Sequence, residues 1–185
     1  MQQPNLSASV LAMVGLRAAG LSSDHPAIKQ GLKFIDSCQN VESPDPNFDD
    51  GGFFQMRDDL MRNKGGKAGT DRKGELRFNS YAAATADGLS GMLLAGRDVN
   101  HPRVMAAIRW LRDHPTISDV ADLHCYAAHA RTRSNALLGA NRLSTISPSL
   151  PQQTDGSISN PHGEMREDDP LVATSLALMS RGQEH

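Results

Sequence analysis

The sequence predicts an all-α fold, and three observations lead to this prediction. Ile28, Leu32 and Ile35 follow the i, i+4, i+7 spacing of an amphipathic helix. The segment AGLSSDHPAIKQGLKFI, residues 19–35, returns 76 residues later as AGRDVNHPRVMAAIRWL, residues 95–111, which indicates an internal repeat. Each copy follows a segment rich in Ala, Ser, Gly, Leu and Met, as is typical of a helix packed on most sides. The sequence therefore predicts pairs of one inner, small-residue helix and one outer, amphipathic helix.

Both copies of the repeat carry signals for the start of the outer helix. Asp24 and Asn100 have the side chains that helix N-caps favour. Pro26 and Pro102 fall in the first turn, where a missing N–H costs nothing. We therefore expect Asp24 and Asn100 to cap the two outer helices, and we expect the Ala-Gly pairs before the repeats to end the inner helices.

The chain is expected to form one domain, residues 1–185, with about six or seven helices. Pro148 and Pro151 lie where the third outer helix should follow, so that helix is expected to be short or broken. Residues 40–78 are rich in Gly, Pro, Asp and Lys and are predicted to be a flexible loop. The expected repeat units cover about 5–40, 79–114 and 120–160, and the last helix covers 169–181.

Composition and charge exclude several classes of function. The chain has 38% hydrophobic and 22% charged residues, which is typical of a globular protein. A net charge of -2 provides no basic surface, so we expect no nucleic-acid partner. Cys38 and Cys125 do not amount to a disulfide framework, and no transmembrane segment or signal peptide is apparent, so a cytoplasmic location is predicted. The alternative is that Met1 is an internal start and that a targeting segment precedes it.

Six segments, taken in chain order, resemble the prenyltransferase and squalene-cyclase repeats of the terpenoid cyclase alpha-alpha toroid superfamily. They are AAGLSSDHPAIKQGLKFIDSCQN, DDGGFF, FNSYAAATADGLSGMLLAG, HPRVMAAIRWLRDH, QQTDGSISN and DDPLVATSLAL. The chain is most similar to bacterial squalene-cyclase-like repeat proteins of unassigned activity. The resemblance implies a partial alpha-alpha toroid of inner and outer helices, equivalent to the C-terminal half of a family ring or somewhat more.

One motif of the family is present with a single departure. In the family, a glutamine and a tryptophan stand in the pattern Q-x-x-D-G-S-W, and Gln152, Asp155, Gly156 and Ser157 match it. Ile158 replaces the tryptophan. The resemblance thus implies weaker stacking of this motif on the neighbouring helix start.

The resemblance also provides candidate catalytic residues. Class II terpene cyclases use an Asp-x-Asp-Asp acid, and the most similar string here ends in Asp168 and Asp169, with Arg166 at the first position. The alternative interpretation is a helix N-terminus whose acids favour the helix dipole. The chain has one Trp, two Tyr and five Phe, which is few for a cavity that stabilises carbocations.

Zinc prenyltransferases provide a second template. Asp122, Cys125 and His129 have suitable residue types, and their i, i+3, i+7 spacing places them on one helical face. The family spaces its Asp and Cys by two positions rather than three, and Val172 stands where the family places a later histidine ligand. The alternative interpretation is a small buried cysteine that packs in the core.

Two further features are interpreted as structural. His25 and His101 recur at equivalent positions beside proline, which indicates helix starts rather than catalysis. Gly51 and Gly52 are expected to form a turn, with Phe53 or Phe54 anchoring it to the core.

The leading functional hypothesis is a squalene-cyclase-like repeat protein without intact catalytic motifs, which binds an apolar ligand or a protein partner. No cofactor is expected under this hypothesis. The alternative is an isoprenoid enzyme, either a cyclase that uses Asp168 and Asp169 or a transferase that binds zinc through Asp122, Cys125 and His129. A third interpretation is a fragment whose exposed inner-helix surface promotes self-association.

Overall fold

The computed structural model describes residues 4–115, 123–139, 143, 151–162 and 166–181. These residues form six α-helices, one short 3-10 helix and a two-stranded sheet, which confirms the predicted all-α class. The helices are α1 (Leu6–Ala18), α2 (Pro26–Ser37), α3 (Ala82–Leu94), α4 (Pro102–Asp113), α5 (His124–Leu138) and α6 (Pro170–Arg181). The 3-10 helix is η1 (Pro46–Phe48), and the strands are β1 (Lys67–Thr70) and β2 (Leu76–Phe78).

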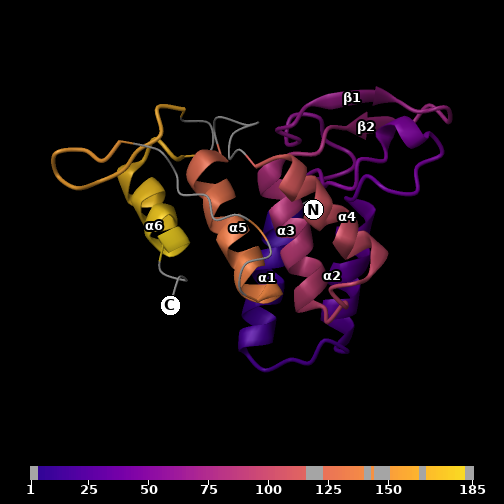
Figure 1. The fold of residues 1–185 in the computed structure, drawn as a ribbon, viewed down its shortest axis with the longest axis horizontal. Coiled ribbons are helices and arrows are strands. Elements are labelled where there is room, and N and C mark those ends of the chain that lie inside the picture. Colours follow the sequence, from indigo (N-terminus) through magenta and orange to yellow (C-terminus); the bar gives the residue numbers. More distant parts are fainter. Residues whose placement is uncertain (1–3, 116–122, 140–142, 144–150, 163–165, 182–185) are drawn as a thin grey trace.

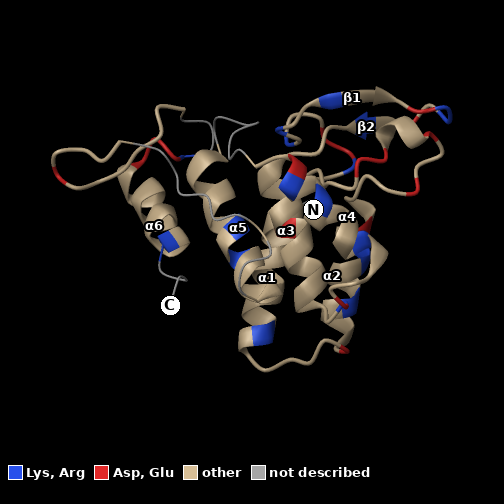
Figure 2. Cartoon of the chain, in the orientation of Figure 1, with Lys and Arg blue, Asp and Glu red and all other residues tan. Residues whose placement is uncertain are grey.

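The helices are arranged as inner and outer elements. α1 packs on α3, α3 on α5, and α5 on α6, while α2 packs on α1 and α3, and α4 packs on α3 (Figure 1). Charged side chains gather on the hairpin, its loops and the outer helices, and the inner helices carry few of them (Figure 2). Most of the segment expected to form the third outer helix, residues 144–150, lies outside the described residues.

The outer helices begin one residue later than the sequence predicts. The N-caps of α2 and α4 are His25 and His101, whose Nδ1 atoms accept hydrogen bonds from the backbone N–H two residues further on, at 3.2 and 3.3 Å. The prediction that Asp24 and Asn100 are the caps is wrong. Proline takes the first helical position in both helices, so the cap must be the residue directly before it. This also gives the two histidines the structural role expected of them.

The inner helices α1 and α3 end at the predicted Ala-Gly pairs. Gly20 and Gly96 follow the last turns with φ of 88° and 78°, a conformation that favours glycine. The N–H of the residue after each glycine donates to a backbone carbonyl in the last turn, that of Leu16 in α1 and that of Met92 in α3. These hydrogen bonds terminate the two helices.

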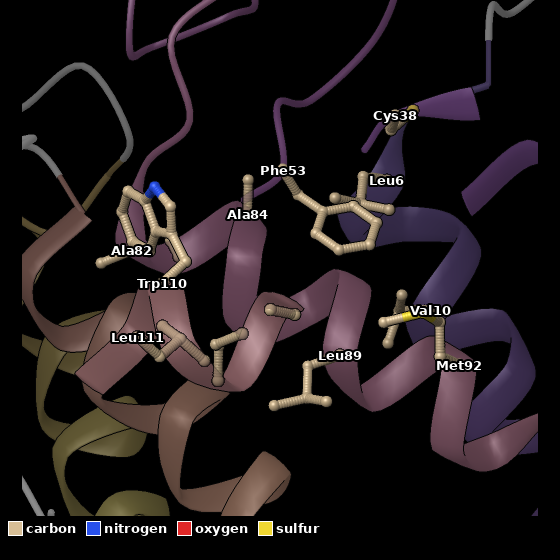
Figure 3. Packing of buried hydrophobic residues seen from close by; sticks show 14 of the residues in the cluster. Leu6, Val10, Cys38, Phe53, Ala82, Ala84, Leu89, Met92, Trp110 and Leu111 are labelled. Carbon is tan, nitrogen blue, oxygen red and sulfur yellow. The ribbon is translucent and has the colours of Figure 1, made fainter. Parts of the chain in front are cut away.

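Phe53 packs closely against the inner helix α3. Its side chain is fully buried, and its ring lies over α3 beside Leu6 (Figure 3). A Cβ added at Gly88 of α3 would lie 2.4 Å from a ring carbon of Phe53, so only glycine permits this contact. Phe54 is 4% exposed, which confirms that the Phe-Phe pair anchors the preceding turn to the core.

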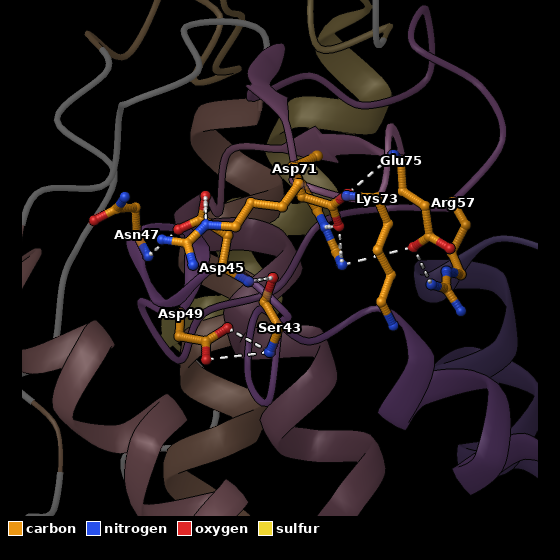
Figure 4. A network of polar contacts seen from close by, with 10 residues as sticks. Ser43, Asp45, Asn47, Asp49, Arg57, Asp71, Lys73 and Glu75 are labelled. Atoms are coloured by element: carbon orange, nitrogen blue, oxygen red, sulfur yellow. Dashed lines mark hydrogen bonds and ion pairs between the residues drawn. The ribbon is translucent and has the colours of Figure 1, made fainter.

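The segment 40–78, predicted from its composition to be a flexible loop, contains the 3-10 helix η1 and a β-hairpin. β1 and β2 pair antiparallel, with Thr70 opposite Leu76. The Asp71 carboxylate closes the hairpin, because it accepts two hydrogen bonds from Arg77, at 2.6 and 2.9 Å, and two from backbone N–H groups. Asp49 likewise accepts from the backbone N–H of Ser43 (Figure 4). These contacts compensate for the few apolar residues of the segment.

A turn closed by a glutamine side chain occurs twice. In the first turn, residues 39–53, Gln39 Nε2 donates to the Gly51 carbonyl at 3.0 Å. In the second turn, residues 152–158, Gln152 Nε2 donates to the Gly156 carbonyl at 2.8 Å. The two glycines have φ of 84° and 88°. Antiparallel bridges join the turn ends, Gln39 with Phe53 and Gln152 with Ile158.

Each turn is anchored to the inner helix that follows it. The N–H of Phe53 donates to Thr85 Oγ1 of α3 at 3.0 Å, and the N–H of Ile158 donates to Thr174 Oγ1 of α6 at 2.8 Å. The glutamine motif therefore has a structural role here, and Thr174 of α6 stands at the position of Thr85 in α3.

Candidate functional site

A pocket of about 830 Å³ lies along the inner helices and is the candidate functional site. It takes residues from α1, α3, α5 and α6, and from the segment between the first turn and β1. Its volume falls in the range of roughly 300 to 1,000 Å³ that small-molecule sites occupy. α6 supplies much of an apolar wall with Leu171, Val172, Leu176 and Met179.

Polar side chains at another part of the pocket bond to one another. Gln55 is central, because its Oε1 accepts from the Tyr81 hydroxyl at 3.1 Å. Its Nε2 donates to Asn5 Oδ1 at 3.1 Å and to Ser7 Oγ at 3.2 Å. These four side chains line the pocket and hold one another in place before any ligand binds.

Asp87 lies behind this polar region and is fully buried in α3. Its carboxylate forms an ion pair with Arg133 of α5 and accepts from Ser7 Oγ at 2.6 Å and from the Tyr126 hydroxyl at 2.8 Å. Burial raises the pKa of Asp87, while Arg133 and the two hydroxyls act to lower it. Burial and the Asp87 charge raise the pKa of Tyr126, so this hydroxyl keeps its proton and donates to the carboxylate.

Glu167 links the pocket to the start of α5. It is 1% exposed, and its carboxylate accepts from the backbone N–H of Cys125 at 2.9 Å and of Tyr126 at 2.7 Å. Asn160 Nδ2 donates to the same carboxylate at 3.0 Å. A negative charge at a helix N-terminus satisfies the free N–H groups and the helix dipole. Glu167 thus caps α5 from a distant part of the chain.

Asp168 and Asp169, the candidates for a cyclase acid, directly precede α6. Asp169 Oδ1 accepts from the N–H of Leu171 at 2.9 Å, and Arg166 pairs with its other oxygen at 3.3 Å. Asp168 is exposed. Neither residue lines the pocket. The capping contact of Asp169 agrees with the alternative interpretation, and it leaves the catalytic role of both residues a prediction.

The candidate zinc ligands are only partly described, because Asp122 lies outside the described residues. Cys125 and His129 lie four residues apart on α5. Cys125 is a free, fully buried cysteine that packs with Ile158, Ala173 and Ala177. Burial and the Glu167 carboxylate raise its pKa to about 12. These surroundings fit a packed thiol better than a thiolate ligand, and the zinc hypothesis stays a prediction.

His129 has one ring nitrogen in a buried position. Its Nδ1 has no hydrogen-bond partner among the described residues. Burial, and then the nearby charge of Arg133, lower the pKa of His129. Within the described part of the chain, no group of three His, Cys, Asp or Glu side chains is placed as a metal site would require.

Two charged residues behind the pocket that the sequence reasoning missed share one signal. Asp87 and Arg133 are charges inside inner helices made mostly of small and apolar residues. A charge on such a helix must pair with an opposite charge when it is buried. Glu167 gave no such signal, because its carboxylate bonds to backbone N–H groups of α5 and to the Asn160 side chain rather than to an opposite charge.

Comparisons with protein-family models, with curated proteins and with solved structures gave no match for this chain. In the described residues, none of the helices has the length and hydrophobicity that a membrane crossing requires.

Proposed function

We propose that this chain is a binding scaffold that takes up an apolar ligand in the pocket along its inner helices. The observation that carries the proposal is the apolar wall of α6, which includes Leu171 at 76% exposure and Met179 at 45%. Leu11 of α1, 48% exposed, also lines the pocket. Large apolar side chains that stay this accessible in a pocket favour a ligand that covers them.

The polar region of the pocket limits the chemistry of the ligand. Ser7 and Tyr126 already bond to Asp87, and Gln55 already bonds to Tyr81. A ligand with many polar groups would have to break these bonds, whereas an apolar chain with one hydroxyl or carbonyl would not. The resemblance to squalene-cyclase-like repeats favours an isoprenoid as this apolar chain.

A thermal melt with candidate ligands tests the proposal. The purified chain is heated alone and with farnesol, geranylgeraniol or squalene. A ligand at 100 times its dissociation constant adds about 2.7 kcal/mol. For a chain of this size, we expect the melting temperature to rise by about 5 to 10 °C.

A pair of matched variants tests whether the shift in melting temperature comes from binding in the pocket. Met179→Glu places a charge on the apolar wall and should abolish the shift. Leu76→Glu changes a similarly exposed residue, 40% against 45%, that lies on β2 and does not line the pocket. It should keep the shift. A melting temperature that no ligand raises, or a shift that Met179→Glu leaves intact, would contradict the proposal.

The enzyme hypothesis has separate tests. A cyclase that uses Asp168 and Asp169 requires product formation from an isoprenoid substrate that is lost in Asp169→Asn. A zinc transferase requires stoichiometric zinc that is lost in Cys125→Ala. If neither result is obtained, the enzyme hypothesis fails and the binding proposal is unaffected.

A further inference from the structure

Two cationic side chains line the same pocket as the apolar wall of α6. They are Arg62 and Lys64, which belong to the loop between the first turn and β1. Arg62 is exposed and Lys64 is half-buried. The proposed function accounts for the apolar wall of the pocket, but an uncharged ligand would make no use of either cation.

Asn63, which stands between the two cations, attaches this loop to the polar side of the pocket. It is 2% exposed, and its Oδ1 accepts from the backbone N–H of Gln55 at 2.8 Å and of Met56 at 3.1 Å. Its Nδ2 donates to the carbonyls of Met56 and Asp59, at 2.6 and 2.8 Å. The buried Asn63 side chain thus closes the loop, and the two cations start from a backbone that it holds in place.

A second contact brings the next residue of the loop to the same side. Gly65 follows Lys64, and a Cβ added at Gly65 would lie 3.0 Å from Cδ1 of the Tyr81 ring. The Tyr81 hydroxyl donates to Gln55, whose own backbone is bonded to Asn63. The backbone that carries the two cations therefore lies beside the polar side of the pocket.

Arg62 is oriented by a carboxylate of its own loop. Its Nε lies 3.3 Å from Asp59 Oδ2, while Asp59 Oδ1 accepts from the backbone N–H of Met61 at 2.9 Å. A guanidinium has five N–H donors, so a contact through Nε orients the group while its amino nitrogens can bind a second anion. The Arg62 side chain is 56% exposed, so a ligand that enters the pocket can reach it.

The net charge of the pocket lining fits a ligand with one negative charge. Among the described residues that line it, Arg62 and Lys64 are positive and Glu167 is negative, which leaves a net charge of +1. The Glu167 carboxylate is already used, because it accepts from two backbone N–H groups of α5. Asp87, behind the pocket, is paired with Arg133 and adds no net charge.

We infer that the ligand is an amphipathic carboxylic acid, with its apolar chain against the α6 wall and its carboxylate at Arg62 and Lys64. The inference rests on the proposed function, because it names the headgroup of the ligand that the pocket takes. A carboxylate can accept two parallel hydrogen bonds from a guanidinium, and it balances the net charge of the lining. A diphosphate carries several negative charges and would leave an excess of them in a pocket that also contains Glu167.

Three compounds with the same chain and different headgroups test the inference. Farnesoic acid, farnesol and farnesylamine are titrated into the purified chain by isothermal titration calorimetry at pH 8, where the acid is negative and the amine is positive. Farnesoic acid should bind about tenfold more tightly than farnesol, the gain expected from a charge-assisted hydrogen bond in a partly exposed site. Farnesylamine should bind more weakly than farnesol, and farnesyl diphosphate more weakly than farnesoic acid.

Variants that remove one charge assign the preference to the two cations. Arg62→Gln and Lys64→Gln should each reduce the preference for farnesoic acid over farnesol, and the double variant should abolish it. Lys67→Gln is the matched control, because Lys67 is an exposed lysine of the same segment, on β1, that does not line the pocket. It should keep the preference. A far-UV circular dichroism melt checks that each variant folds, and the two single variants carry the test if the double variant does not.

The outcomes separate this inference from the proposed function. Equal binding of farnesoic acid and farnesol, tighter binding of farnesyl diphosphate than of farnesoic acid, or a preference that the folded variants retain would each overturn the inference. The proposed function would survive these results, because farnesol would still bind in the pocket. If neither farnesol nor farnesoic acid binds, the proposed function and this inference both fail.

Discussion

Asp87→Asn should strongly destabilise the fold, because it leaves a buried arginine without its counter-charge. Asp87 is fully buried and Arg133 is 8% exposed, so water cannot replace the lost carboxylate. Removing one partner of a buried ion pair costs about 3 to 5 kcal/mol. At about 2 to 4 °C per kcal/mol for a chain of this size, the melting temperature should fall by roughly 6 to 20 °C.

A double-mutant cycle, measured by urea unfolding, separates the energy of the ion pair from that of the two hydroxyl hydrogen bonds to Asp87. Asp87→Asn, Arg133→Met and the double variant are compared by their free energies of unfolding. The double variant should be destabilised by much less than the sum of the single changes, because it leaves no unpaired charge. If Asp87→Asn costs less than about 1 kcal/mol, or if the two changes simply add, the ion pair does not hold α3 to α5 as we argue.

Three further predictions concern the stability of the same helices. Glu167→Ala should cost about 1 to 2 kcal/mol in urea unfolding, because two N–H groups of α5 lose their acceptor, whereas Asp168→Ala should change little. Gly88→Ala should destabilise the fold by about 1 to 3 kcal/mol, because the new methyl group would clash with Phe53. Gly15→Ala has open space around it and should stabilise the fold by up to about 1 kcal/mol. Equal effects at both positions would refute the packing argument. The pKa of His129 is lowered in the folded chain, so the unfolded chain binds a proton on this histidine more tightly. The free energy of unfolding should therefore fall as the pH drops below about 6.5. His129→Gln should reduce this fall, as measured by the difference in unfolding free energy between pH 8 and pH 5.

The helices could be predicted from the sequence because their signals are local. The spacing of Ile28, Leu32 and Ile35 and the proline at each outer-helix start depend only on neighbouring residues. The error at the caps has a local cause too. Asp24 has the better capping side chain, but proline at the first helical position fixes which residue precedes the helix, and that residue is His25.

The repeated glutamine turn could not be predicted in full, because its two copies differ in length. Gln39 and Gly51 are twelve positions apart, whereas Gln152 and Gly156 are four apart, so no fixed spacing connects them. The hydrogen bonds tolerate this difference because only the two ends of each turn make them. The hairpin of residues 67–78 was missed for a related reason: its stability comes from Asp71 and Arg77 rather than from an alternating apolar pattern.

The pocket is built from segments that lie far apart in the sequence, and its polar side and its α6 wall are held in place by different contacts. Its polar side is fixed by Gln55, Ser7 and Tyr126, which bond to one another or to the buried Asp87. The α6 wall is attached through α5 and through the bonds between Thr174 and the second turn. A ligand that orders few new side chains loses little binding energy to entropy, so the polar side favours recognition of one fixed group. α6 supplies the apolar side chains Leu171, Val172, Leu176 and Met179 of the opposite wall, so we expect the length of this wall to limit the length of the apolar part of a ligand.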